Sequence, residues 1–145
     1  MRRIIAVSGG FDPIHEGHVR MIKEAAEHGD VVVILNSDDW LERKKGYKFM
    51  PFKERGYIVG NIKGVIGVYH VDDTDGTVCE ALRIIKPDVF ANGGDRYETN
   101  TPEMAVCAEL GIKMMWNVGG GKIQSSSSLV NRLMWSKRKV NNVEF

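Results

Sequence analysis

The sequence lacks an excess of charge of either sign, has no long hydrophobic run and contains only two cysteines. Its 145 residues carry 20 Lys and Arg against 19 Asp and Glu, so no broad basic field is available for nucleic-acid binding. Apolar runs such as Val31–Leu35 are far too short to cross a bilayer, and no membrane partner is expected. Cys79 and Cys107 lack a metal-binding spacing, which predicts two buried free thiols in a cytoplasmic protein.

The composition that remains is that of a globular domain. Hydrophobic residues make up 43% of the chain and charged residues 27%, which excludes a disordered or fibrous protein. Too few apolar residues follow Arg2 and Arg3 for a secretory signal, so a buried first strand is expected there. No repeat, linker or break in composition divides the chain, and one domain over residues 1–145 is predicted.

Short β-branched segments alternate with longer amphipathic ones. The predicted strands are Ile4–Val7, Val31–Leu35, Val65–Val71, Val89–Ala91 and Ile112–Trp116. The predicted helices are Val19–His28, Pro51–Gly60, Thr77–Ile85, Thr101–Leu110 and Ser125–Arg138, followed by a polar tail. This alternation predicts an α/β fold, a Rossmann-like five-stranded parallel sheet with helices on both faces.

Glycines and polar residues gather where the predicted strands end. Five such loops span residues 8–18, 36–48, 72–75, 92–100 and 118–128. Because ligands of parallel sheets bind beyond the carboxyl ends of the strands, these loops predict one polar, phosphate-sized site.

The first of these loops carries the clearest chemical pattern. Gly9 and Gly10 let backbone N–H groups approach an anion, because no Cβ stands in the way. The pattern is not GxGxxG, and no acidic residue ends the second strand, so a nicotinamide site is excluded. His15 and His18 share one face at a helix start, where two imidazoles and the helix dipole suit the charge on a phosphate in transfer.

The histidine pair has two other interpretations. His-Glu-Gly-His is one residue shorter than the metalloprotease motif, so the zinc geometry is wrong and no metal ligand is predicted. A purely structural pair of histidines would not ordinarily come with a glycine loop at a strand end.

The stretch Gly9–His18 resembles the Gly-x-Phe-Asp-x-x-His-x-Gly-His signature of the cytidylyltransferase-like nucleotidyltransferases, the superfamily with the HIGH-type motif. That superfamily includes glycerol-3-phosphate cytidylyltransferase and the heptose-1-phosphate adenylyltransferase domain. A second stretch, Lys122–Val130, resembles the serine-rich element that opens the last helix of the family. Serines at a helix start offer hydroxyls, backbone N–H groups and the dipole to phosphates. The alternative, a flexible serine linker, is opposed by the amphipathic helix that follows directly.

Further segments extend the resemblance over nearly the whole chain. Asn36–Asp38 matches the close of the second strand, Lys44–Gly46 a mobile lysine-glycine loop, and Glu54–Arg55 a helix-borne arginine. Asn92–Asp95 matches the Lys-Gly-Gly-Asp stretch of the heptose-type enzymes. Surface lysines commonly have no function, and an aspartate after two glycines either caps its turn or binds a ribose or base.

Two positions depart from the family pattern. Many cytidylyltransferases have threonine or serine where this chain has Gly10, which removes a hydroxyl that could contact phosphate. The arginine that precedes the second signature has no counterpart, and Gly119–Lys122 stands in its place, with Lys122 as the substitute cation. Both departures weaken a close identity with glycerol-3-phosphate cytidylyltransferase.

The resemblance implies a role for each candidate residue. The catalytic residues are His18, His15 and Lys45. The nucleotide-binding residues are Gly9, Gly10, Phe11, Asp12, Gly17, Asn92, Gly94, Asp95, Lys122, Ser125, Ser126 and Ser127. The residues for the second substrate are Asp38, Lys44 and Arg55. Mg²⁺ is expected to bind mainly through the triphosphate, and Asp12 is expected to position either this ion or a substrate hydroxyl.

The implied reaction is attack by a substrate phosphate on the α-phosphorus of a nucleoside triphosphate, with release of pyrophosphate. CTP is favoured slightly over ATP, and the acceptor is a phosphorylated polyol, a sugar phosphate or a phosphonate. The resemblance also suggests a homodimer. A fragment of a class I aminoacyl-tRNA synthetase is disfavoured by length, by the missing Lys-Met-Ser-Lys-Ser element and by the absent basic face. A non-catalytic nucleotide-binding module is the remaining alternative.

Overall fold

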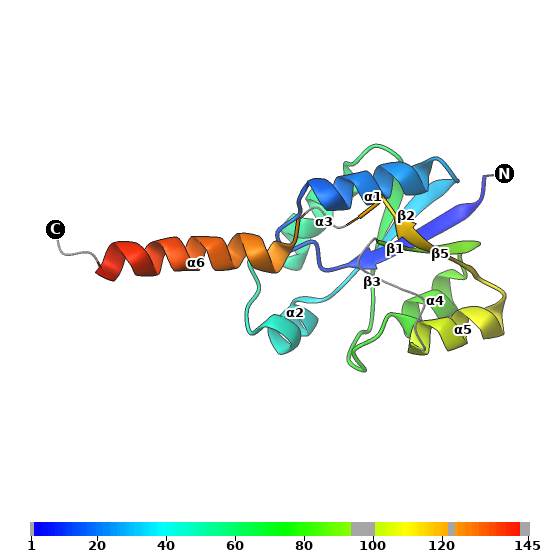
Figure 1. Ribbon diagram of the computed structural model, residues 1–145. Coiled ribbons are helices and arrows are strands. Elements are labelled where there is room, and N and C mark those ends of the chain that lie inside the picture. Colours follow the sequence, from blue (N-terminus) through cyan, green and yellow to red (C-terminus); the bar gives the residue numbers. More distant parts are fainter. Residues whose placement is uncertain (1, 94–100, 122–123, 143–145) are drawn as a thin grey trace.

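A single parallel sheet organises the computed structural model, which describes residues 2–93, 101–121 and 124–142 (Figure 1). Its strands are β1 (Ile4–Gly9), β2 (Asp30–Leu35), β3 (Val65–His70), β4 (Val89–Gly93) and β5 (Lys113–Val118). The strand order is β3-β2-β1-β4-β5, and every pairing is parallel. The predicted α/β fold with a five-stranded parallel sheet is therefore confirmed.

Helices cover both faces of the sheet. They are α1 (Glu16–Ala26), α2 (Asp38–Lys45), α3 (Phe52–Gly60), α4 (Cys79–Ile85), α5 (Pro102–Leu110) and α6 (Ser126–Asn142). Helices α1 and α3 pack against one face of the sheet, whereas α4 and α5 pack against the other. Helix α6 extends away from the sheet (Figure 1).

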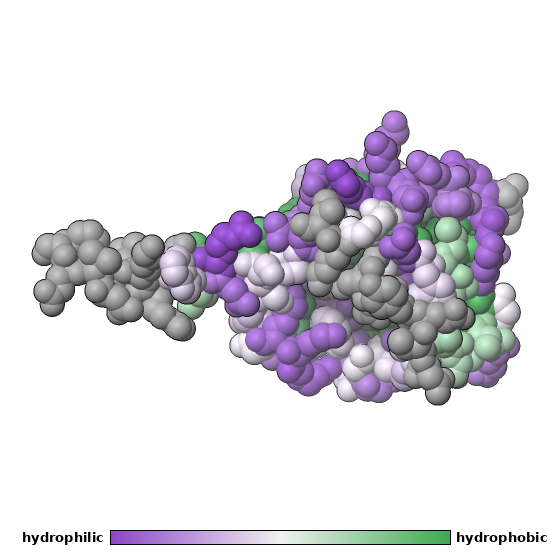
Figure 2. All heavy atoms as spheres, viewed as in Figure 1, coloured by the Kyte–Doolittle hydropathy of each residue, from purple (hydrophilic) through white to green (hydrophobic). Residues whose placement is uncertain are grey.

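The central strands are apolar almost throughout because both of their faces are buried. In β1, Ile5 and Val7 belong to the core layer under α1 and α3, while Ala6 belongs to the layer under α4 and α5, and all three are fully buried. The visible face of the molecule in Figure 2 is mostly hydrophilic, as expected when the apolar side chains fill these two layers. In the described part of the chain, no helix combines the length and the hydrophobicity that a membrane span requires.

Helix α2 corrects the prediction of a mobile lysine-glycine loop. The Ser37 hydroxyl accepts the N–H of Trp40 at 3.0 Å and caps the helix start, and Gly46 ends it with a left-handed φ of 84°. Asp38 and Asp39 lie in its first turn and three basic residues in its last, which suits the helix dipole. Only Leu41 is buried, so the apolar periodicity that marks longer helices is absent.

Two helix ends also differ from prediction. Helix α1 begins at Glu16 rather than Val19, because His15 caps it. Helix α6 continues to Asn142, beyond the predicted end at Arg138.

Candidate active site

Two histidines build the N-terminus of α1. His15 Nδ1 accepts the N–H of Gly17 at 3.1 Å, and His18 Nδ1 accepts the N–H of His15 at 3.2 Å. This reciprocal arrangement is a capping box in which imidazoles replace the usual hydroxyl and carboxylate. Because both Nδ1 atoms accept hydrogen bonds, the ring proton of each neutral imidazole is on Nε2. Each histidine is thereby prepared as a hydrogen-bond donor through Nε2.

Packing fixes the orientation of the two rings. The imidazoles of His15 and His18 stack with centroids 3.8 Å apart and planes 24° apart. The buried ring of Phe11 meets His18 edge-on at 4.7 Å. Phe11 itself has a φ of 51°, in the left-handed region that a non-glycine residue adopts only at a cost. Phe11 thus supports the pair and is absent from the pocket wall that His18 lines.

A pocket of about 350 Å³ opens beside the histidines. Its lining comes from the starts of α1 and α6, the end of α2, and the ends of β4 and β5: His15, Gly17, His18, Met21, Lys44, Lys45, Gly93, Val118, Gly119, Gly120, Gly121, Gln124, Ser125, Ser126 and Ser127. The structure thus brings together parts of both predicted signatures with Lys44 and Lys45. Among these lining residues there is no carboxylate, so the described wall of the pocket suits an anion.

The two lysines of α2 have different surroundings. Lys45 is half-buried, and burial lowers the pKa of its ammonium group, although the nearby Asp12 carboxylate opposes this shift. Lys44 is exposed, and its Nζ lies 4.8 Å from the centre of the Trp40 ring. An anion in the pocket would stabilise the charge of Lys45, the lysine that burial destabilises.

The three serines at the start of α6 make different contacts. Ser125 caps the helix, since its hydroxyl accepts the N–H of Ser128 at 3.0 Å. Ser126 Oγ donates to the carbonyl of Pro13 at 2.6 Å and so fastens the helix start to the first loop. Ser127 is exposed at the pocket. The helix start therefore offers an anion its backbone N–H groups and the Ser127 hydroxyl.

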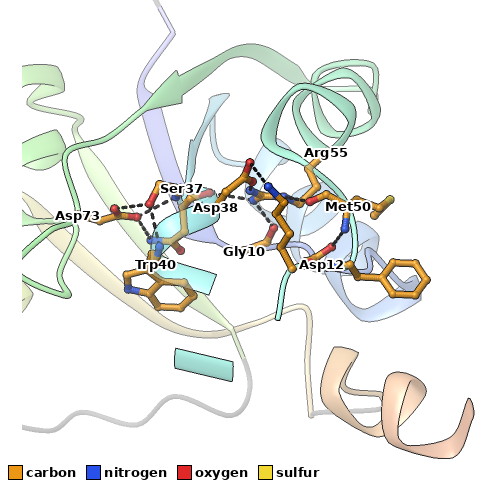
Figure 3. Close-up of polar contacts among 11 residues, drawn as sticks. Gly10, Asp12, Ser37, Asp38, Trp40, Met50, Arg55 and Asp73 are labelled. Carbon is orange, nitrogen blue, oxygen red and sulfur yellow. Dashed lines mark hydrogen bonds and ion pairs between the residues drawn. The ribbon is translucent and has the colours of Figure 1, made fainter. Parts of the chain in front are cut away.

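Arg55 corrects the prediction that this cation contacts a substrate phosphate. Its side chain has no exposed surface and donates to the carbonyls of Met50 (2.9 Å), Gly10 (2.9 Å) and Asn36 (2.8 Å), and to Asp38 Oδ1 (2.6 Å; Figure 3). The donors of Arg55 therefore bind carbonyls of the first loop, of the end of β2 and of the segment before α3, and link these three parts of the chain.

Two of the three predicted aspartates, Asp38 and Asp12, also lie outside the pocket wall. Burial alone would raise the pKa of Asp38, but the hydrogen bond and charge of Arg55, together with Lys48, hold that pKa below its usual value. The oxygens of Asp12 each accept one backbone N–H at 2.6 Å, from Phe49 and Met50 (Figure 3). Asp12 thus positions the segment before α3, and no group of three metal-ligating side chains occurs in the described residues.

Gly10 has a packing reason for departing from the family pattern. A Cβ atom at this position would lie 2.7 Å from Leu41 Cδ2. Helix α2 therefore occupies the space that a serine or threonine side chain would need.

The remaining predicted residues divide into three groups. Gly17 lines the pocket. Gly9 does not, because it faces the Phe11 ring, and Asn92 is buried and donates a hydrogen bond from its side-chain amide to the carbonyl of Met115. Gly94, Asp95 and Lys122 lie outside the described residues. Seven lining residues were not named individually from the sequence: Met21, Gly93, Val118, Gly119, Gly120, Gly121 and Gln124. All of them except Met21 lie in the strand-end loops 92–100 and 118–128 that were predicted to form the site. The glycine run after the fifth strand was the signal that could have identified three of them, Gly119, Gly120 and Gly121.

Comparison with known proteins identifies the family of the chain. A family model described as cytidylyltransferase-like matches residues 6–127. The bifunctional protein HldE of Aliarcobacter butzleri is 30% identical in an alignment 145 residues long, which covers 97% of this chain and 29% of that protein. The FAD synthase of Ferroglobus placidus is 34% identical over 97 residues, covering 67% of this chain and 62% of the synthase. The chain thus spans less than a third of the bifunctional relative.

A solved structure supports the fold alone. The lipopolysaccharide core biosynthesis protein from Thermoplasma volcanium superposes with a TM-score of 0.67 at 19% sequence identity, covering 81% of this chain and 97% of that chain.

Proposed function

Because the chain belongs to the cytidylyltransferase-like family of nucleotidyltransferases, we propose that its pocket transfers a nucleoside monophosphate from a nucleoside triphosphate to a phosphorylated small molecule. The observation that carries the proposal is one carboxylate-poor pocket wall shared by the histidine pair, Lys45 and the serine start of α6. Two imidazole donors, an ammonium group and a helix N-terminus are the groups that stabilise a phosphoryl centre under attack.

In the proposed reaction, a phosphate oxygen of the acceptor attacks the α-phosphorus, and the bond to the bridging oxygen of the pyrophosphate breaks. The acceptor phosphate is already anionic, so no general base is needed. His18 and His15 donate from Nε2 to the phosphate oxygens, and Lys45 neutralises the same region. The start of α6 holds the terminal phosphates through Ser127 and backbone N–H groups. Mg²⁺, when bound to the triphosphate, neutralises part of its charge.

The donor nucleotide is ATP or CTP. Similarity to stand-alone cytidylyltransferases favours CTP slightly, but the relatives give CTP no advantage, since one of them is named FAD synthase and a flavin adenine dinucleotide contains an adenylyl group. The resemblance of Asn92–Asp95 to the heptose-type enzymes supports ATP as well. We therefore propose ATP and CTP as the two donors to assay first, against sugar and polyol phosphates.

Two substitutions at His18 test the proposal. Asparagine can keep an acceptor near the position of Nδ1 and so preserve the cap, but it lacks the Nε2 donor. His18→Asn should therefore lower turnover roughly 100-fold, which is the scale for removing one transition-state donor. Gln can place a donor near Nε2, so His18→Gln should retain more activity than His18→Asn.

The exposed His28, at the far end of α1, supplies the control. His28→Asn should leave turnover unchanged, and thermal unfolding should show that all variants are folded. Near-normal turnover in folded His18→Asn would remove the histidine pair from the mechanism. Nucleotide binding without any product would instead favour a non-catalytic module.

The proposal includes the homodimer that the family resemblance suggests, and light scattering should then give twice the mass of one chain.

A further inference from the structure

Glu24 occupies an unfavourable place in its own helix. It lies near the C-terminus of α1, where the helix dipole disfavours a negative charge. Its carboxylate nevertheless accepts a hydrogen bond from the backbone N–H of Gly119 at 2.6 Å, across a sequence separation of 95 residues. Such a short contact from N–H to an ionised carboxylate is among the stronger hydrogen bonds in proteins. This long-range contact explains an acidic residue that local helix chemistry disfavours.

The segment that Glu24 holds follows a demanding path. Asn117, Gly119 and Gly120 have φ angles of 58°, 87° and 81°, all in the left-handed region. A Cβ atom at residue 119 would lie 2.8 Å from both N and Cα of Met21, so the segment crosses the backbone of α1 without spare room. Glycine adopts such angles at little cost, so the close approach to Met21 and the hydrogen bond to Glu24 are what tie this path to α1.

This segment is also part of the pocket. Gly119, Gly120 and Gly121 line it, as does Met21 of the helix they cross. The run then leads to Ser125–Ser127, the other half of the phosphate-binding wall. Any displacement of the run would therefore change both the shape of the pocket and the approach to the start of α6.

We infer that Glu24 is a positioning residue, which fixes the glycine run in the conformation that binds the nucleoside triphosphate. This inference rests on the proposed function and adds to it a residue that lies outside the pocket lining. Without the carboxylate, the run samples other conformations, and each binding event must reorder it. The cost falls on nucleotide affinity, while the donors at His15 and His18 stay in place.

The experiment compares Glu24→Ala, Glu24→Gln and the control Glu27→Ala, which removes an exposed carboxylate three residues along the same chain segment. Steady-state kinetics are measured with the donor nucleotide, and hydrogen exchange follows the amide of Gly119. Glu24→Ala should raise the KM for the nucleotide about tenfold with kcat changed less than about twofold, and should speed exchange at Gly119. Glu24→Gln retains an acceptor and should recover most of the affinity, and Glu27→Ala should behave as wild type.

The outcomes separate this inference from the proposed function. An active wild-type enzyme with an unchanged nucleotide KM in Glu24→Ala refutes the role of Glu24 alone. Equal losses in Glu24→Gln and Glu24→Ala also refute it, because the acceptor would then be irrelevant. A wild-type protein that neither binds nor transfers any nucleotide refutes the proposed function itself, and the role of Glu24 in nucleotide binding with it. Should Glu24→Ala fail to fold, the Glu24→Gln kinetics and exchange still decide the question.

Discussion

Replacing Arg55 by methionine removes the guanidinium that joins three separate segments. Methionine matches much of the length of the side chain but leaves the carbonyls of Gly10, Asn36 and Met50 without their donor. It also leaves Asp38 without a charge partner that lies 2.6 Å away. The side chain of Asp38 is 28% exposed, so water can solvate its carboxylate in part.

The cost follows from these groups. Removing one partner of a buried ion pair costs about 3–5 kcal/mol, and each buried polar group left unsatisfied costs about 1–3 kcal/mol. Partial solvation of Asp38 offsets most of the ion-pair loss, so the three carbonyls set the lower limit, and Arg55→Met should lose at least about 3 kcal/mol of unfolding free energy. Because a domain of this size has only about 5–15 kcal/mol in total, the loss is a large fraction of its stability.

Urea denaturation measures this loss directly. Arg55→Lys keeps the charge but not the fork of donors, and should lose about 1–3 kcal/mol. The exposed Lys53 on the same helix gives the control, and Lys53→Met should change stability by less than about 0.5 kcal/mol. A loss below about 1 kcal/mol in Arg55→Met would refute the structural role. If Arg55→Lys kept full stability but lost all turnover, the sequence-based prediction that Arg55 contacts the substrate would be supported instead.

Three further predictions concern the same region. Gly10→Ser should cost about 1–3 kcal/mol in urea denaturation through its clash with Leu41, and less in a chain that also carries Leu41→Ala. If Gly10→Ser cost the same stability with and without Leu41→Ala, the clash with Leu41 would be excluded as the cause. Lys45→Met should lower turnover more than Lys44→Met, because Lys45 is the more buried of the two in the pocket, and equal losses would contradict this ranking. The pKa of Asp38 is lowered in the fold, so its stabilising contribution is present above an unfolded pKa of about 3.9 and is lost as pH falls. As the pH falls below about 4, the unfolding free energy of Asp38→Asn should therefore decrease less than that of wild type. Parallel curves of unfolding free energy against pH would contradict the lowered pKa of Asp38.

The sheet could be predicted because each strand has a local signal. β1 and β2 are short apolar segments with glycine or polar residues immediately after them, and parallel pairing then places their ends at one edge. The histidine pair could be predicted for the same reason, since its loop follows β1 directly.

Helix α2 could not be predicted with the same method. It has a single buried residue, Leu41, and its capping residue Ser37 also fits a strand-ending turn. Short helices are held by their caps and tertiary contacts rather than by an apolar stripe.

Contacts between distant segments were equally inaccessible. Arg55 was expected in the pocket because a cation suits phosphate, but its actual acceptors are carbonyls contributed from residues 10, 36 and 50. The bond between Glu24 and Gly119 joins positions 95 residues apart. No local pattern in the sequence specifies either contact.

Transfer of a nucleotidyl group is tested most directly by following the α-phosphorus. The purified protein is incubated with Mg²⁺, a sugar or polyol phosphate, and ATP or CTP labelled in either the α- or the γ-phosphate. We predict that the α-label enters a new product only when the acceptor is present, while the γ-label is released as pyrophosphate. Transfer of the γ-label to the acceptor, or no transfer of the α-label with any pair of substrates, would contradict the account.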